Sequence, residues 1–249
     1  MLAASLVVGA ASAVLERARP GTRLPEVHGW TKRASWFAVM EAATVVTLFL
    51  GWLAWVDVEP LFDLSDATVA AQVALNWLLS TFVFYWWHRV RHSSDVLWRW
   101  THQLHHSPRR IETITAFYKH PFEVAADTLL NLVLSFCVLG VSTEAFLLHV
   151  SCVACSQFFV HMNVATPRWI GYFLSRPEMH RIHHELGVHK NNYADLPLWD
   201  MLFGTYENPY ARPVECGFAA GREARVLDML LLRDTHATKI HATKEDSHV

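Results

Sequence analysis

Charged residues are scarce in this 249-residue sequence: Asp, Glu, Lys and Arg make up 18% of it, and the formal net charge is −2. Without an excess of positive charge the chain has little to hold a phosphate backbone, so we do not expect nucleic acid as a partner. A glycine-rich dinucleotide fingerprint and the His-Glu-x-x-His motif are also absent. These absences argue against a built-in dinucleotide site and against zinc proteolysis.

Cysteine is scarce as well. Only Cys152 and Cys155 form a C-x-x-C pair, which lies inside an apolar run with no second pair elsewhere. Structural zinc sites and iron–sulfur clusters need more thiolates than one such pair supplies. We therefore interpret the four cysteines as small packing residues rather than as a metal or redox site.

Apolar residues, by contrast, make up 52% of the chain, with eleven Trp and fourteen Phe, which is typical of a membrane protein. Residues 34–56 carry one charge and residues 67–87 carry none, and each run is long enough to cross a bilayer. Residues 128–160 predict a helical hairpin that turns between Gly140 and Glu144. The first fifteen residues are apolar, too few for a full span, and not preceded by the basic segment of a cleaved signal. They predict a partial or interfacial helix.

The basic residues predict how the spans are oriented. Five Lys and Arg precede residue 34, six lie between residues 89 and 119, and ten follow residue 167. The loop at residues 57–66 has none and carries four acidic residues, so the positive-inside rule places it outside. The sequence therefore predicts an all-α integral membrane bundle of about four spans, plus the N-terminal helix, with a helical cap and the C-terminus on the cytoplasmic side.

Eight histidines fall into three clusters with the spacing of a helix face. Residues three or four apart on a helix project from the same side, and neutral imidazole is the commonest metal ligand. Eight ligands exceed the four that one zinc normally takes, so the pattern favours two metal ions held close together over isolated core histidines. The candidate ligands are His88 and His92, then His102, His105 and His106, then His180, His183 and His184.

Local signals place these clusters on helices at the membrane surface. The second span can continue through the first cluster, and residues 93–95 can cap a new helix that carries the second cluster. Ser175 and Glu178 have the spacing of a capping box, with Pro177 in the first turn. They predict a helix that carries the third cluster and ends near Gly187.

These clusters, in this order and topology, resemble the histidine boxes of the fatty acid hydroxylase/sterol desaturase superfamily. His-Pro-Phe-Glu at residues 120–123, His-Met-Asn at 161–163 and the segment at 198–206 look like that family too, whereas Ala194 stands where a glycine usually follows Asn-Tyr. The resemblance covers roughly residues 34–210. We therefore expect a helix and basic loop at 1–33, a catalytic domain at 34–210 and a polar tail at 211–249.

The resemblance implies a non-haem diiron oxygenase that uses O2 and two electrons to hydroxylate or desaturate a lipid. The clustered histidines would be the iron ligands, and zinc could replace iron on overexpression. His161 becomes a ninth candidate ligand, and His120 and His189 are two further ones. The remaining histidines considered are interpreted as structural or solvated: His149, His236, His241 and His248.

Acidic residues near the clusters are candidates to orient the imidazoles, because a ligating histidine normally donates its other N–H to an acceptor. The alternative is that they are solvated helix caps. The four candidates are Asp95, Glu178, Asp195 and Asp200.

Electrons are expected from a separate ferredoxin, or from a small cytochrome with its reductase, because the sequence shows no redox motif of its own. The family's sterol, fatty acyl, ceramide, alkylglycerol and carotenoid substrates all stay open. Two other classes remain alternatives, a b-type haem electron carrier and a non-catalytic metal-binding or transport protein. Five arginines near the first two clusters either form a docking surface for an acidic electron carrier or only set the orientation of the spans: Arg89, Arg91, Arg99, Arg109 and Arg110.

Overall fold

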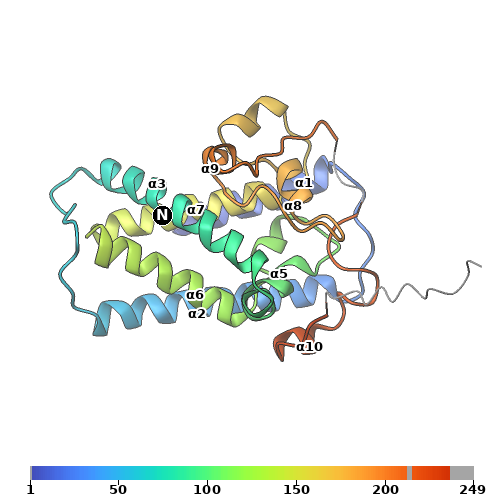
Figure 1. The fold of residues 1–249 in the computed structure, drawn as a ribbon, viewed down its shortest axis with the longest axis horizontal. Helices are drawn as coiled ribbons and strands as arrows, with labels where there is room; N and C mark the ends of the chain where they lie inside the picture. Colours follow the sequence, from blue (N-terminus) through green and yellow to red (C-terminus); the bar gives the residue numbers. More distant parts are fainter. Residues whose placement is uncertain (1, 212–214, 236–249) are drawn as a thin grey trace, which may run out of the picture.

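The computed structural model describes residues 2–211 and 215–235. Within these ranges every regular element is helical, and the one β-type contact is an isolated bridge between Glu185 and Cys216. Long helices lie side by side as a bundle, and shorter ones gather at one end of it as a cap (Figure 1). The predicted all-α class is confirmed.

Four helices of the bundle are long and apolar enough to cross a membrane, as predicted. Their outward faces expose large apolar side chains, such as Val39 and Leu50 on one helix and Leu78 on the next. Lipid tolerates such surfaces, whereas water would not. The four are α2 (Trp30–Trp55), α3 (Val69–Ser93), α6 (Pro121–Leu132) with its π-helical continuation η3 (Val133–Val138), and α7 (Thr143–His161).

The predicted helical hairpin is present, but it begins at Pro121 rather than at residue 128. His120 starts the helix early, because its Nδ1 accepts the Phe122 N–H and Pro121 occupies the first helical position. The turn lies at Gly140, where φ is +58° and an added Cβ would meet the Phe62 carbonyl oxygen at 2.7 Å. Only glycine fits such a turn without strain.

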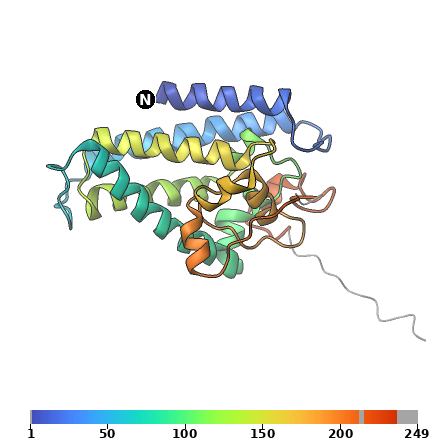
Figure 2. The same ribbon diagram turned by 90° about the horizontal axis from the view of Figure 1, so that it is seen from above.

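Helix α1 (Leu2–Ala18) runs alongside α7 rather than across the end of the bundle (Figure 2). Its 17 residues span about 25 Å, less than the roughly 30 Å hydrocarbon layer of a bilayer. The buried Glu16 near its end accepts hydrogen bonds from the backbone N–H groups of Thr113 and Asn163, which attach the helix to the cap. The N-terminal helix therefore packs along the bundle and is shorter than a full span.

The second histidine cluster lies on a helix that begins where predicted, because the Ser94 hydroxyl caps α4 (Asp95–Leu97). A π-helical segment, η1 (Trp98–His102), then leads into α5 (Gln103–His106). Buried apolar side chains from this part of the cap pack against α2 and join the cap to the bundle: Trp30 and Phe37 of α2 with Trp98, Leu104, Tyr118 and Phe218.

The third cluster lies on α8 (Pro177–His183), which starts with its proline in the first turn as predicted. The predicted capping box is wrong, because Arg176 is the N-cap and the Glu178 carboxylate accepts hydrogen bonds from Thr166 instead. The helix also ends before Gly187. The remaining short elements are η2 (Thr113–Phe117), η4 (Arg168–Tyr172), α9 (Pro197–Leu202) and α10 (Val226–Leu230).

Candidate metal centre

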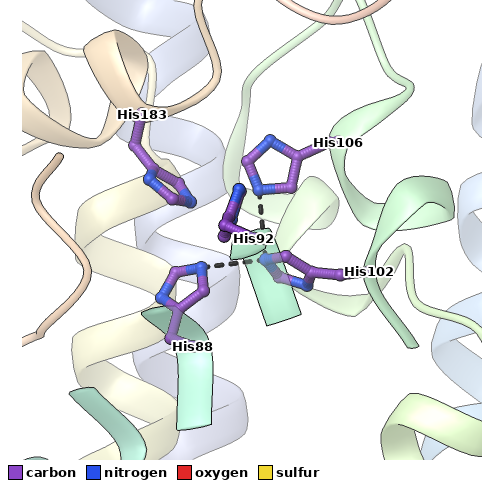
Figure 3. A group of neighbouring side chains, drawn as sticks. All are labelled: His88, His92, His102, His106 and His183. Carbon is purple, nitrogen blue, oxygen red and sulfur yellow. Dashed lines mark hydrogen bonds between the residues drawn. The ribbon is translucent and has the colours of Figure 1, made fainter. Parts of the chain in front are cut away.

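Nine histidines converge where the bundle meets the cap, and they form two groups. Within each group, one nitrogen of every histidine lies within 4.8 Å of the corresponding nitrogens of the others. Figure 3 shows the larger group, whose imidazoles point toward one another from α3, from the η1–α5 segment and from α8. The five-histidine group is His88, His92, His102, His106 and His183, and the four-histidine group is His105, His161, His180 and His184.

The second cluster, on η1 and α5, and the third cluster, on α8 and its C-cap, each contribute to both groups. His102 and His106 belong to the five-histidine group, whereas His105 belongs to the four-histidine group. On α8, His183 is separated from His180 in the same way. A single helix can supply ligands to both groups because the groups are adjacent. The ring of His106, in the five-histidine group, stacks on that of His184, in the four-histidine group, at a centroid distance of 4.1 Å.

The nitrogen positions fit a metal ion in each group. In the five-histidine group, the His102 Nε2 lies 2.8 Å from that of His88 and 3.1 Å from that of His106. In the four-histidine group, the successive Nε2 distances are 3.0, 3.0 and 3.4 Å. Metal–nitrogen bonds of about 2.1 Å separate neighbouring ligand atoms by about 3.0 Å in octahedral and about 3.4 Å in tetrahedral geometry.

Two unpaired ring nitrogens also indicate a metal ion in the five-histidine group. Among the described residues, the buried Nε2 atoms of His92 and His183 have no hydrogen-bond partner. Buried polar atoms are almost always paired, because burial without a partner costs free energy. Both atoms belong to the five-histidine group, so a metal ion there would satisfy them.

The imidazoles of the cap are neutral because they are buried. Burial lowers the pKa of His183 to about 3. Neutral imidazole carries the free lone pair that a metal needs. Burial, with charged neighbours as a smaller cause, also lowers the pKa well below its usual value for the other cap members: His102, His105, His106, His180 and His184.

Backbone carbonyl groups orient three of the imidazoles. The Nδ1 atoms of His88, His183 and His161 lie 2.7, 2.8 and 2.8 Å from the carbonyl oxygens of Tyr193, Asn191 and Gln157. A carbonyl oxygen can only accept, so each Nδ1 carries the hydrogen and each Nε2 is left with its lone pair. Asn191 reaches His183 from a left-handed backbone conformation with φ of 67°, which asparagine tolerates.

A buried carboxylate, Glu123, orients a fourth imidazole. Its Oε1 lies 2.7 Å from the His102 Nδ1 and 2.9 Å from the Arg91 Nη1. Arg91 also lies 3.5 Å from Asp127, which in turn accepts the indole N–H of Trp87. Our sequence interpretation did not assign Glu123 this role, although a carboxylate inside an apolar hairpin is a signal that could have identified it.

Three of the four acidic residues predicted to orient imidazoles bind other groups, and the fourth is exposed. Asp95 is exposed, Glu178 binds Thr166 and Arg176, and Asp195 binds Gln157. Asp200 acts one step further out. It accepts the backbone N–H groups of Tyr193 and Ala194 and so holds the segment whose carbonyl receives His88.

His120 and His189 lie outside both groups. His120 caps α6, and its Nε2 lies 3.4 Å from the Leu230 carbonyl oxygen. His189 approaches the outer side of a candidate ligand, with its Nδ1 3.0 Å from the Nδ1 of His106. His149 is buried in α7 with its Nε2 3.2 Å from the Asn131 side-chain oxygen. The tail histidines lie outside the described residues: His236, His241 and His248.

The sequence was compared with known proteins. The fatty acid hydroxylase family profile matches residues 73–205. The chain is 30% identical to the alkylglycerol monooxygenase of Xenopus tropicalis over 139 residues, which is 53% of this chain and 30% of that protein. It is 33% identical to the ornithine lipid hydroxylase OlsE of Rhizobium tropici over 148 residues, 57% of this chain and 43% of that protein.

A third relative is aligned over more of its length. The chain is 25% identical to the sphinganine C4-monooxygenase 1 of Arabidopsis thaliana over 177 residues, 70% of this chain and 68% of that protein. The chain therefore spans less than half the length of the first two relatives and about two thirds of the third. No solved structure matches the chain.

Proposed function

Since the chain belongs to the fatty acid hydroxylase family, we propose that it is a membrane diiron oxygenase that hydroxylates or desaturates a lipid. The observation that carries the proposal is the pair of adjoining histidine groups at the end of the bundle. The names of the three relatives, each a monooxygenase or hydroxylase of a lipid, support the same reaction class.

The two groups would each hold one iron ion. Two iron ions, when bound, would supply the reductive activation of O2 that attack on an unactivated C–H bond requires. In hydroxylation, the substrate, O2, two electrons and two protons give the alcohol and one water molecule. In desaturation, the same reactants give the alkene and two water molecules. The electrons come from a separate reduced carrier protein.

The residues of the chain position and shield this centre. Carbonyl groups and Glu123 hold the outer nitrogens of His88, His102, His161 and His183, so the inner nitrogens keep a fixed direction. The rings are largely or fully buried, which keeps them neutral and keeps bulk water away from the reacting carbon.

The substrate is proposed to reach the centre from the bilayer. His88 and His92 lie on α3, and His161 is the last residue of α7, and both helices are candidate spans. A lipid chain beside these helices would therefore bring its carbon atoms to the groups without leaving the membrane. We propose that the cap and the groups face the cytoplasm, since the basic residues flank them and the acidic loop lies at the other end.

The two alternative classes fit the geometry less well. A haem iron is surrounded by its own macrocycle and takes protein ligands only in axial positions. Imidazole nitrogens 2.8–3.4 Å apart in one group leave no room for a macrocycle between them. A transport protein would carry ionisable residues along a path through its spans, whereas the nine clustered histidines gather where the bundle meets the cap.

Lipid mass spectrometry on cells with and without the protein tests the proposal. We expect a lipid one oxygen atom heavier, or two hydrogen atoms lighter, only in cells that make the protein. The product should disappear with His184→Ala, a member of the four-histidine group, and persist with His120→Gln, which lies outside both groups. An unchanged lipid profile with correctly inserted, iron-loaded protein would refute the oxygenase assignment.

A further inference from the structure

A pocket of about 390 Å³ opens on the cap beside α8. Three arginines, Arg23, Arg109 and Arg181, line it together with the carboxylates of Glu26 and Glu215. Its walls therefore come from the α1–α2 connection, from the segment after α5, from α8 and from the segment after residue 214. The α1–α2 connection lies at the end of the molecule remote from the α6–α7 turn (Figure 2), so the pocket lies at the cap end of the bundle.

Arg181 is the unusual group in this pocket, because its side chain is buried without a carboxylate. The residue is 3% exposed, and its Nη1 lies 3.5 Å from the Ile111 carbonyl oxygen. Among the described residues, its Nε has no hydrogen-bond partner, and no carboxylate lies within 4.0 Å of its nitrogens. Arg176 at the start of the same helix, by contrast, pairs with Glu178 and donates to Asn208.

A buried guanidinium without a negative partner is unfavourable, because desolvation of its charge is not compensated. The two pocket carboxylates do not supply that partner, since Glu26 and Glu215 are exposed. Arg109 is already engaged at 3.8 Å with Glu223, while Arg23 is exposed at the rim. An anionic oxygen group from outside the chain would complete the site, and arginine binds carboxylates in a bidentate manner.

Arg181 lies directly beside both histidine groups. It follows His180 of the four-histidine group and precedes His183 of the five-histidine group by two residues. Anything bound in the pocket is therefore one helical turn of α8 from candidate ligands of both ions. The proposed oxygenase needs a carrier that approaches closely enough to deliver two electrons, and a carrier bound at this pocket would lie near candidate ligands of both groups.

We propose that the pocket receives an acidic side chain of the electron-donor protein, and this inference rests on the proposed oxygenase function. The other arginines that the sequence pointed to are largely engaged within the chain. Arg91 is buried against Glu123, Arg110 pairs with Glu112, and Arg89 donates to the Tyr85 hydroxyl. These three are therefore poorly placed to bind a partner.

Binding measurements with an acidic [2Fe–2S] ferredoxin test the proposal directly. The iron-loaded protein in detergent is titrated with the ferredoxin at low salt, so that the readout is Kd and not turnover. We expect Arg181→Gln to raise Kd at least tenfold and the rim variant Arg23→Gln to raise it about threefold. Arg181→Lys keeps the charge but not the bidentate geometry, and should recover part of the affinity.

Arg233→Gln is the matched control, because Arg233 is 65% exposed and pairs with Asp228 outside the pocket. Its Kd should equal that of the unmodified protein. Iron content measured on every variant shows whether a change near α8 has disturbed the histidine groups. Unchanged Kd in both Arg181→Gln and Arg23→Gln, with iron retained, would overturn the docking proposal.

Two further arms separate the source of the anion and the dependence on function. Acetate replaces chloride at constant ionic strength, and competition with the ferredoxin that disappears in Arg181→Gln supports carboxylate recognition in the pocket. Acetate binding that leaves the ferredoxin Kd unchanged would mean a small-anion site and would overturn the donor assignment.

Lipid oxidation driven by dithionite tests the oxygenase separately, because a chemical reductant bypasses docking. If dithionite drives no lipid oxidation, the proposed function is wrong. If dithionite drives oxidation but the ferredoxin-driven rate is unaffected by Arg181→Gln, only the docking site is wrong.

Discussion

At the level of single residues, Glu123 is a carboxylate that contacts the five-histidine group directly. It contacts both the His102 Nδ1 and Arg91, and it is buried. Glu123→Gln keeps the shape of the side chain but removes its charge, so the imidazole is oriented less firmly and Arg91 loses its partner. We expect metal affinity at this group to fall about 10–100-fold, so that purified protein retains close to one metal per chain instead of two.

Metal analysis after dialysis against a weak chelator measures this loss. Asp95→Asn is the matched control, because Asp95 is an exposed carboxylate near the same cluster. The structure predicts no change in its metal content. Equal losses in both variants would contradict the role assigned to Glu123 and would restore Asp95 as a residue that orients the cluster.

At the level of secondary-structure elements, the helical turn where η1 ends and α5 begins would serve two metal ions. His102→Ala should remove the ion of the five-histidine group, and His105→Ala, only three residues away, should remove the ion of the four-histidine group. Each single variant is expected to retain about one metal per chain and the double variant almost none, since a site that loses one ligand binds its ion much more weakly.

Metal stoichiometry combined with iron spectroscopy distinguishes the two single variants, which should show different residual sites. Loss of both ions in either single variant would mean that the groups bind metal only as a unit. Identical residual spectra would mean that the division of the cluster between groups is wrong.

At the level of the whole molecule, the buried histidines make the stability of the metal-free cap depend on pH. Their folded-state pKa values are lowered, to about 3 for His183, whereas the unfolded chain titrates near pH 6.5. The unfolded state therefore binds more protons, so stability is fully present above about pH 6.5 and is lost as the pH falls toward the folded value. Thermal unfolding of chelator-treated protein between pH 8 and about pH 4 should show a falling Tm.

Bound metal opposes this effect, because ligation requires neutral imidazole and protons compete with the ion. Metal-loaded protein should keep its Tm to lower pH than the metal-free form and then lose both metal and stability together. A Tm that stays constant from pH 7 to about pH 5 in the metal-free protein would contradict burial of neutral imidazoles as the cause.

The proposed orientation of the bundle is also a whole-molecule property. Leu61 lies in the acidic loop and is 73% exposed, and Tyr210 lies on the cap side and is 88% exposed. A membrane-impermeant maleimide applied to whole cells should label Leu61→Cys, whereas Tyr210→Cys should be labelled only after lysis. The reverse pattern would place the cap outside the cell.

Residues beyond the boundary expected near residue 210 contact the cap. The Gly217 N–H donates to the His184 carbonyl, and the Phe218 N–H donates to that of Ser107. The side chain of Phe218 is buried in the core of the cap. We therefore propose that the folded unit includes residues 215–235. Their contacts with Ser107 and His184 support the part of the cap that carries the histidine groups.

Several features of this protein follow from the sequence alone, because they depend on local properties. A run of about twenty residues without charges forms a helix long enough to cross the hydrocarbon layer of a bilayer, and its apolar side chains favour lipid. Such runs therefore predict the spans. Helical spacing within each histidine cluster brings imidazoles to one face whatever the surroundings. The hydroxyl of Ser94 next to Asp95 marked a helix start that the structure confirms.

Other features were decided only by the tertiary structure. Helical periodicity defines a face but not the neighbour that this face meets, so the division of His102, His105 and His106 between two groups depends on how α8 packs against α5. The partner of His102 is Glu123, which lies 21 residues away, rather than the nearby Asp95. The acceptors of His88 and His183 are backbone carbonyls, which every residue possesses, and only their position in the folded chain distinguishes them.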